Sequence, residues 1–452
     1  MKYQFSLFVV VSICLALAVV SCQSQDPFVL ASQSIVSETP VRSGAGVYKP
    51  GYALYDLGEP PQAVADYFDK GSGNLHFPYY IDGLLTFALK VTDADLVSLW
   101  LNVQESGEPD VMHRYLQTDW YWLTYRVPEK AAILYHFNIK KHQDERYTLR
   151  DPLNRSVSAN APYESLWTFE SGKSLGRLEY LELAYDLPGR KKPVGYAPPV
   201  NRKMLIYVPP DYDRTIDERY PVIYMQDGQN AWDSSTANYG GWKIDRVMNQ
   251  LIGENKIPKA LVVSIFNTNY RSEEYAGAGF AAAGRPGGQR SEEIAAYYRD
   301  WVIMVLKPYI DSCYRTLPDS QHTGVLGSSY GGTVAIYWSL SRPDVFGFAG
   351  ALSYAPGDEV NLDGGMTSLC RDTYLPLIGE GDGKYPRIWL DCGLKGLDKT
   401  LAPFVSALDQ VLREGPYTLG QDYHFERFTG ADHNEAAWYR RLPVILEFLL
   451  QP

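Results

Sequence analysis

The fold of this chain is limited most strongly by a short serine motif with glycines on both sides, Gly327–Gly332. An apolar segment, Thr323–Leu326, precedes the motif, and a segment with helical periodicity, Thr333–Trp338, follows it. A G-x-S-x-G motif between a strand and a helix is typical of a nucleophile elbow, whose sharp turn requires glycine beside the central residue. We therefore expect Ser329 to present its hydroxyl at the carboxyl edge of a sheet. Ser328 is the alternative in register, but it lacks the paired glycines.

The region around this motif alternates between apolar strands and helical segments. The expected strands are Met204–Val208, Val222–Met225, Ala260–Phe266, Gly324–Leu326 and Ile388–Leu390. The expected helices are Trp242–Leu251, Ser291–Tyr314, Gly332–Leu340, Leu401–Arg413 and Asn434–Leu450. This alternation predicts βαβ units and a mostly parallel sheet with helices on both faces. We assign residues 203–452 to one α/β domain.

The preceding region has a different pattern. Residues 59–185 contain short runs rich in β-branched and aromatic residues, separated by turn residues, which predicts a smaller all-β sandwich. The proline-rich stretch 186–202 is predicted to be a linker. Within the sandwich, strand alternation places Trp120 and Trp122 on one face. These two rings could pack in the core or form a platform for a sugar.

The N-terminus predicts export. Phe5–Val20 is almost continuously apolar and follows Lys2; as a helix it would span only about 24 Å, less than a bilayer core of about 30 Å. This pattern indicates a signal peptide over residues 1–22. Val19–Cys22 resembles a bacterial lipobox, so we expect a lipid anchor on Cys22 and a membrane-attached protein, periplasmic or at the cell surface. Residues 23–58 would form its tether; the alternative is an ordinary secretory signal.

The charge balance argues against a nucleic-acid partner. The chain has 42 Lys and Arg against 53 Asp and Glu, a formal net charge of -11, and no basic cluster. We find no metal-ligand spacing of His and Cys, so we expect neither a metal nor another cofactor. Downstream of the signal segment, Cys313, Cys370 and Cys392 allow at most one disulfide, whose pairing the sequence does not specify.

A serine nucleophile needs a general base. Two histidines, His424 and His433, lie downstream of the motif. His424 falls in a probable strand, whereas His433 falls in a loop before the last helix, so we assign His433 as the base. For the acid that orients the base we prefer Asp398, expected on a loop after the strand 387–390. Asp391 at the strand end, or a dyad without a buried acid, are the alternatives.

Backbone N–H groups are expected to stabilise the oxyanion. The N–H of Tyr330 lies at a helix N-terminus. A second donor should follow the strand Val222–Met225, where Gly228 and Gln229 are the candidates. An ordinary type I turn at this position is the alternative.

Four motifs, in order, resemble those of the putative-esterase family. They are Tyr224–Asn230, Asn269–Tyr275, Gly327–Gly332 and His433–Trp438. The family has the α/β-hydrolase fold and includes enterochelin esterases, feruloyl and acetylxylan esterases, S-formylglutathione hydrolases and mycolyltransferases. The resemblance covers about residues 200 to 450.

The resemblance implies Ser329 as nucleophile, His433 as base and an acid after the strand 387–390. Many members carry that acid three residues after the glycine equivalent to Gly393. In this chain that position is Gly396, so the sequence departs from the family pattern.

The resemblance also implies that Arg271 and Trp438 line the acyl or alcohol pocket. The front half is similar to the immunoglobulin-like early-set sandwich that precedes enterochelin esterases and some feruloyl esterases. Trp120, Tyr135–Phe137 and Asp151–Asn154 carry that similarity.

These features together predict a serine esterase. Its substrate would be a small-molecule or saccharide ester, in particular a siderophore or carbohydrate-linked ester, hydrolysed through an acyl-enzyme. An acyltransferase on the same fold and a non-catalytic lipoprotein that binds glycans or siderophores are the alternatives.

Overall fold

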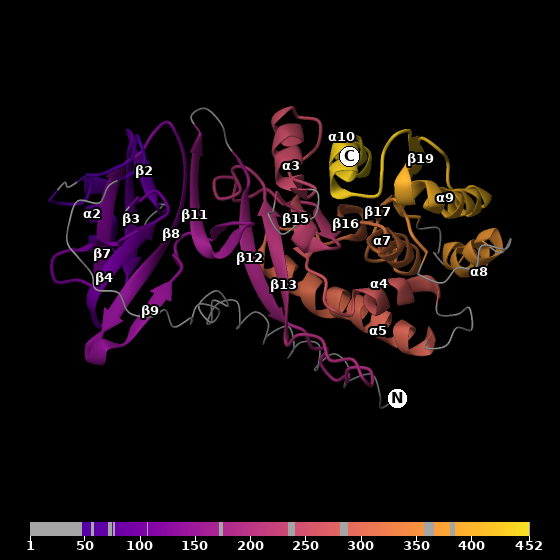
Figure 1. Cartoon of the computed structure of the whole chain (residues 1–452), viewed down its shortest axis with the longest axis horizontal. Helices are drawn as coiled ribbons and strands as arrows, with labels where there is room; N and C mark the ends of the chain where they lie inside the picture. Colours follow the sequence, from indigo (N-terminus) through magenta and orange to yellow (C-terminus); the bar gives the residue numbers. More distant parts are fainter. Residues whose placement is uncertain are drawn as a thin grey trace. The chain divides into compact units, whose positions relative to one another are not determined.

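The computed structural model describes residues 48–55, 58–70, 75, 77–105, 107–170, 175–233, 240–280, 288–356, 366–379 and 385–451. The chain divides into two compact units (Figure 1), of which the larger contains Leu181–Pro452 and the smaller ends at Tyr180. The expected signal segment, Cys22 and most of the tether lie outside the described residues. Within the described ranges, no helix is both long enough and apolar enough to cross a membrane.

The larger unit is built on a mixed, mostly parallel sheet. Its strands, in spatial order, are β13 (Asn201–Val208), β15 (Leu261–Ile265), β14 (Val222–Met225), β16 (Thr323–Ser328), β17 (Phe348–Leu352), β18 (Arg387–Gly393) and β19 (Tyr423–Phe428). Only the pairing of β13 with β15 is antiparallel within this series. The predicted α/β sheet is therefore confirmed, with β13 as its antiparallel member.

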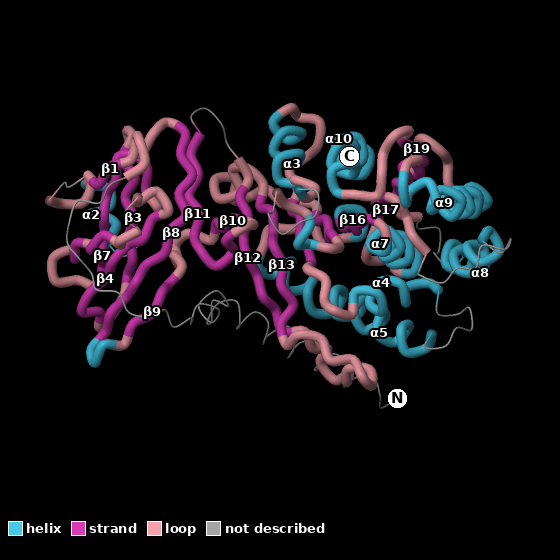
Figure 2. Tube along the Cα trace, viewed as in Figure 1, coloured by secondary structure: helices cyan, strands magenta, loops and turns pink. Residues whose placement is uncertain are grey.

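Helices cover both faces of this sheet. They are α3 (Ile244–Gly253), α4 (Arg271–Phe280), α5 (Gly288–Trp301), α6 (Lys307–Cys313), α7 (Tyr330–Ser341), α8 (Met366–Gly379), α9 (Gly396–Glu414) and α10 (Glu435–Leu449). A π-helical turn, Val302–Leu306, joins α5 to α6. In Figure 1, α3 and α10 lie on one side of the sheet, and α4, α5 and α7 lie on the other. Figure 2 shows this alternation of helix and strand along the larger unit.

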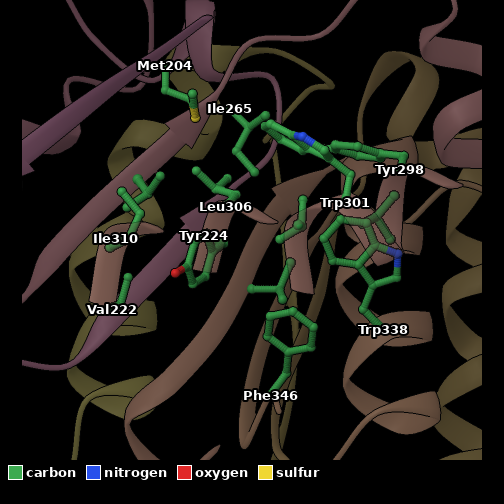
Figure 3. Close-up of a cluster of buried hydrophobic side chains, with 14 of the residues drawn as sticks. Met204, Val222, Tyr224, Ile265, Tyr298, Trp301, Leu306, Ile310, Trp338 and Phe346 are labelled. Carbon is green, nitrogen blue, oxygen red and sulfur yellow. The ribbon is translucent and has the colours of Figure 1, made fainter. Parts of the chain in front are cut away.

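The core of the larger unit forms where apolar side chains of the strands meet those of the helices. Figure 3 shows one such cluster, in which Met204, Tyr224 and Ile265 from the strands face Trp301 and Trp338 from α5 and α7. All of these side chains are fully buried. Strands buried on both faces read as continuous apolar runs, which explains why the sequence pattern located them.

The smaller unit consists of antiparallel sheets around a shared core. One sheet contains β1 (Ala53–Leu54), β2 (Tyr79–Ile81), β3 (Leu84–Lys90), β6 (His113–Arg114) and β7 (Trp120–Arg126). The other strands are β4 (Ala94–Leu101), β5 (Asp110–Val111), β8 (Lys130–Lys141), β9 (Arg146–Leu149), β10 (Ser156–Ser158) and β11 (Ala161–Glu170), and β12 (Arg177–Ala184) pairs with β10. Alternate residues of β3, β4, β7 and β8 enclose one apolar core, as in a sandwich. Its assignment to the early-set class stays a prediction.

The two tryptophans of β7 are core residues rather than a sugar platform. Trp120 and Trp122 are buried on the outer face of their sheet, beneath α2 (Gln62–Lys70). The Trp120 ring stacks on Phe68 of that helix, with the ring centroids 4.8 Å apart. Tyr121 points to the opposite face, into the sandwich core, as strand alternation predicts.

Two segments expected to be free of the domains are packed instead. In the tether 23–58, Ala53–Leu54 form β1 and pair with β7. In the linker 186–202, Leu187 and Tyr196 are buried in the core of the larger unit. Proline-rich segments lack periodicity, so a pattern search does not reveal single apolar side chains that anchor them.

Candidate active site

Ser329 occupies a strained turn between β16 and α7. Its backbone has φ of 56° and ψ of -127°, a conformation that is costly for a residue with a Cβ. A Cβ at Gly327 would lie 2.5 Å from the carbonyl carbon of Gly331, so the turn cannot close unless this position is glycine. The strand–turn–helix arrangement expected around Ser329 is therefore present.

The three proposed oxyanion donors lie at the starts of two helical segments. Tyr330 is the first residue of α7, so its N–H has no acceptor within the helix. Gly228 and Gln229 open a 3₁₀ helix (Gly228–Asn230) after β14, and its first hydrogen bond runs from the Asn230 N–H to Asp227 O. The N–H groups of Gly228 and Gln229 precede that bond and are free of intrahelical acceptors.

The two donor loops lie next to each other. A Cβ at Gly331 would approach Cβ of Gln226 to 3.0 Å, so the elbow packs against the end of β14. A Cβ at Gly228 would lie 2.5 Å from the carbonyl of Ser264, so only glycine fits at this position. Glycines on both loops thus permit the close approach that a shared oxyanion site requires.

His433 and Asp398 form a hydrogen-bonded pair. Nδ1 of His433 lies 2.6 Å from Oδ1 of Asp398. The carboxylate is fully buried, and the imidazole side chain is 12% exposed. Burial opposes ionisation of Asp398, but hydrogen bonds from His433, Ser353 and the Gly393 N–H outweigh it and hold the pKa of this carboxyl below its ordinary value.

The position of Asp398 corrects one expectation. We expected a loop residue, but Asp398 lies in the first turn of α9, which begins at Gly396 rather than at residue 401. Gly396 has φ of 55°, and a Cβ there would collide with the carboxylate of Asp432, next to His433. At the position where many family members carry the acid, this chain has a glycine, which lets the start of α9 approach the loop that carries His433.

Asp391 has other partners. It lies within β18, where its Oδ1 forms an ion pair with Nη2 of Arg441 at 2.9 Å and its Oδ2 accepts from the indole N–H of Trp389 at 2.8 Å. Burial raises the pKa of Asp391, and the Arg441 charge opposes that rise. His424, on β19, stacks on Trp389 with the ring centroids 4.2 Å apart, as expected of a structural residue. Of the two acids considered, Asp398 is the one that contacts the imidazole of His433.

Arg271 connects the two donor loops. It is the first residue of α4, and its guanidinium binds both carboxylate oxygens of Asp227, with Nε to Oδ1 at 2.7 Å and Nη2 to Oδ2 at 2.8 Å. The same guanidinium lies 5.4 Å from the ring centroid of Tyr330. Arg271 is therefore partly exposed beside the elbow, but its charge is paired.

Trp438 lies against the histidine and has little open surface. Its ring makes an edge contact with His433, at 5.1 Å between centroids, and its indole N–H donates to Oγ of Ser353 at 2.9 Å. Only 6% of the residue is exposed. This arrangement leaves less room for a ligand beside Trp438 than we expected from the pocket-lining role that the resemblance implies.

Several residues behind this site were not among the candidates of the sequence analysis. Ser353 and Arg441 contact Asp398 or Asp391 from distant parts of the chain. Arg202 and Glu274 form a buried ion pair with Nη1–Oε1 at 2.7 Å and Nη2–Oε2 at 2.9 Å, which anchors α4 and with it Arg271. Of these four residues only Glu274 lies in a motif, Asn269–Tyr275, and only the folded chain brings each residue to its partner.

The two buried cysteines do not offer a rival nucleophile. Among the described residues, no disulfide joins Cys313, Cys370 and Cys392. Burial raises the pKa of Cys370 and of Cys392 to about 12, so both thiols are protonated near neutral pH. Among the described residues, no group of three or more His, Cys, Asp or Glu side chains could hold a metal ion.

A mixed sheet with a serine elbow after β16 and an Asp–His pair after β18 and β19 defines an α/β-hydrolase-like fold. The family model described as "Putative esterase" matches residues 197–449 of this chain. The chain therefore belongs to this family, which confirms the resemblance drawn from its motifs.

Two curated relatives match part of the chain. It is 28% identical over 151 residues to an endo-1,4-beta-xylanase/feruloyl esterase of Xylanibacter ruminicola, and 23% identical over 159 residues to the uncharacterized protein YbbA of Bacillus subtilis. The matches cover 33% and 34% of this chain. They span only 19% and 56% of the relatives' own lengths.

Two solved structures are similar at low identity. The enterobactin esterase FES from Shigella flexneri is 16% identical, with 89% of this chain and 97% of that chain covered and a TM-score of 0.43. A ferulic acid esterase from Anaeromyces mucronatus is 17% identical, with 62% of this chain and 92% of that chain covered and a TM-score of 0.43.

Proposed function

We propose that this chain is a serine esterase that hydrolyses carboxylic esters through an acyl-enzyme on Ser329. The observation that carries the proposal is the 2.6 Å contact between Nδ1 of His433 and Oδ1 of Asp398, on the sheet that also carries the Ser329 elbow. Membership of the esterase family over residues 197–449 supports the same activity.

Sheet topology supports a joint role for the three side chains. Ser329 follows β16, Asp398 follows β18, and His433 follows β19. These three strands run parallel, with β17 between β16 and β18. Parallel strands end at the same edge of a sheet, so all three residues belong to one edge. In α/β-hydrolases this order along the chain, serine then acid then histidine, is the usual one.

The pair of His433 and Asp398 would make the imidazole a base. Because the ionised Asp398 accepts the Nδ1–H, the lone pair of His433 is on Nε2 and free to take the proton of the Ser329 hydroxyl. Ser329 Oγ then bonds to the ester carbonyl carbon, and the carbonyl oxygen becomes an oxyanion. The N–H groups of Tyr330, Gly228 and Gln229 would stabilise it.

The second half of the reaction restores the enzyme. The imidazolium of His433 gives its proton to the leaving alcohol as the ester C–O bond breaks. A water molecule, deprotonated by His433, then attacks the acyl-enzyme, and Ser329 leaves with the returned proton. The net reaction consumes one ester and one water and yields one acid and one alcohol. An alcohol in place of water would make the same site an acyltransferase, which product analysis with added alcohol distinguishes.

For the substrate class, we propose carbohydrate-linked or siderophore esters. Family membership and the partial match to a protein named as a xylanase/feruloyl esterase support this choice. A panel of a feruloylated sugar, an acetylated xylose and a catechol trilactone tests it. Activity confined to simple p-nitrophenyl esters would contradict it.

We also propose that the protein is exported and carries lipid on Cys22. The apolar stretch Phe5–Val20 and the lipobox-like Val19–Cys22 support this. In bacterial cells fed a palmitate analogue, the wild-type chain should be labelled and Cys22→Ser should not. Equal labelling of both chains would contradict the proposal.

The activity test uses the motif's own neighbouring serine as its control. Ser329→Ala should abolish labelling by a fluorophosphonate and reduce hydrolysis of p-nitrophenyl acetate by more than about 10³-fold. Ser328→Ala, in the same motif, should keep both. If Ser329→Ala hydrolyses the ester at the wild-type rate, or if the wild-type protein takes no label, the proposal is wrong.

A further inference from the structure

A buried serine lies directly behind the catalytic acid. Ser353 follows β17, is fully buried and has φ of 47°, an unfavourable backbone conformation for serine. Its Oγ lies 2.7 Å from Oδ2 of Asp398, 2.9 Å from Nε1 of Trp438 and 2.7 Å from Nη2 of Arg441. One hydroxyl thus meets three polar groups from α9 and α10.

The chemistry of these partners fixes the direction of the hydroxyl proton. An indole N–H and a guanidinium N–H can only donate, and a serine oxygen has two lone pairs and one proton. Because Trp438 and Arg441 occupy both lone pairs, the proton of Ser353 must point to Asp398.

The remaining contacts of Asp398 then divide between its two oxygens. Oδ2 accepts from the Ser353 hydroxyl and from the Gly393 N–H, each at 2.7 Å, which fills its two lone pairs. Oδ1 is left for Nδ1–H of His433 at 2.6 Å. The carboxylate is therefore held in the rotation that serves the imidazole.

Arg441 is itself fixed by a second buried acid. Its Nη2 lies 2.9 Å from Oδ1 of Asp391 and 3.9 Å from Oδ2 of Asp398. Asp391 also accepts from the backbone N–H of Ser353 at 3.1 Å. Within the described part of the chain, Nε and Nη1 of Arg441 have no hydrogen-bond partner, so Nη2 makes all the directed contacts of this side chain.

We propose that Ser353, locked by Arg441 and Trp438, is a positioning residue that holds Asp398 in the orientation required by His433. This inference rests on the esterase mechanism proposed above and adds a residue to it. Removing the hydroxyl would leave Oδ2 with one donor and allow the carboxylate to turn away from the imidazole. It would also leave the buried indole N–H without its acceptor.

The test compares Ser353→Gly with Ser353→Ala. Both variants lack the hydroxyl, but glycine accepts φ of 47° readily, so Ser353→Gly separates the hydroxyl from the backbone strain. We expect kcat/KM for p-nitrophenyl acetate to fall about 10- to 100-fold in both variants, because the imidazole is misplaced. KM should change by less than about twofold, because the hydroxyl does not touch substrate.

The pH dependence of kcat/KM separates a positioning role of Ser353 from a purely structural one, because a structural role would leave it unchanged. A carboxylate that turns away stabilises the imidazolium less, so the acid limb of kcat/KM should move to lower pH. The other charged groups around the pair, unchanged in both variants, are Asp391, Asp432, Glu435 and Arg441.

The outcomes separate the two proposals. If Ser353→Gly keeps the wild-type kcat/KM and acid limb, the positioning role is wrong even though the wild-type enzyme is labelled and active. If kcat/KM falls only in Ser353→Ala, the hydroxyl serves to hold the strained backbone rather than to orient Asp398, and the positioning role is wrong. If the wild-type protein takes no fluorophosphonate label, both proposals fail.

Discussion

Arg271 and Asp227 are joined by two parallel hydrogen bonds, from Nε to Oδ1 and from Nη2 to Oδ2. Asp227 immediately precedes the 3₁₀ helix that offers the Gly228 and Gln229 N–H groups, and its own φ is 54°. The pair therefore ties the strained start of this loop to α4. Because the charge of Arg271 is paired in this way, we expect its main effect to be on the position of the proposed oxyanion donors.

The first prediction concerns the geometry of this pair. Arg271→Lys keeps the charge but loses the two-point contact, so we expect kcat/KM to fall about 10-fold as the donor loop relaxes. Arg290→Lys is the matched control, because Arg290 is an exposed arginine that donates to the backbone of Gly195. Equal kcat/KM values in the two variants would show that the pairing does not matter.

The second prediction follows from the lowered pKa of Asp398. A carboxyl whose pKa is lowered by folding stabilises the protein above its unfolded pKa, near 3.9, and loses that contribution as the pH falls through the folded value. Asp398→Asn should therefore lower the free energy of unfolding at pH 7, and the difference from wild type should shrink below about pH 4. Urea denaturation at pH 7 and below about pH 4 measures the free energy of unfolding of both proteins. A difference between variant and wild type that grows on acidification would contradict the prediction.

The third prediction concerns the buried pair of Arg202 and Glu274. Glu274→Gln leaves a buried guanidinium without its counter-charge, and we expect a loss of about 3–5 kcal/mol in the free energy of unfolding. The double variant Arg202→Met, Glu274→Leu should recover most of it, because no buried charge remains. Glu414→Gln, which breaks a similar two-point pair with Arg371 on the surface, should cost no more than about 1 kcal/mol.

The fourth prediction separates backbone strain from contact at Gly396. Both Gly396 and Gly420 have positive φ, 55° and 83°, but a Cβ at Gly396 would meet Asp432, whereas nothing lies within 4 Å of one at Gly420. Gly420→Ala should therefore cost only about 1 kcal/mol in the free energy of unfolding. Gly396→Ala should cost more and also reduce kcat/KM, since it displaces the loop that carries His433. Similar activity losses in both variants would contradict this.

Local chemistry explains what the sequence could predict. The elbow around Ser329 needs glycines at fixed positions, and the strands of the parallel sheet are continuous apolar runs. Other elements were missed for equally local reasons. β11 contains Pro162 and Glu164, and α4 and α8 have only weak apolar periodicity. β17 is a run of five residues around Gly350, too short and too glycine-rich to stand out.

The supporting residues of the site could not be predicted from the sequence. Ser353 reaches Asp398 across 45 positions of the chain and Arg441 across 88. Neither residue belongs to a motif or a periodic pattern, and a serine or an arginine alone predicts nothing about burial. Their role depends on where three parallel strands end, which only the folded sheet determines.

The strand order predicts which part of the sheet unfolds first on heating. β19 is the outermost strand of its sheet and pairs only with β18 among the described residues, and the loop with His433 follows it directly. An outer strand frays before the interior strands because water reaches its hydrogen bonds first. Amide hydrogens of β19 should thus exchange sooner than those of β16, and mild warming should remove the histidine from its partners while the serine elbow is still folded.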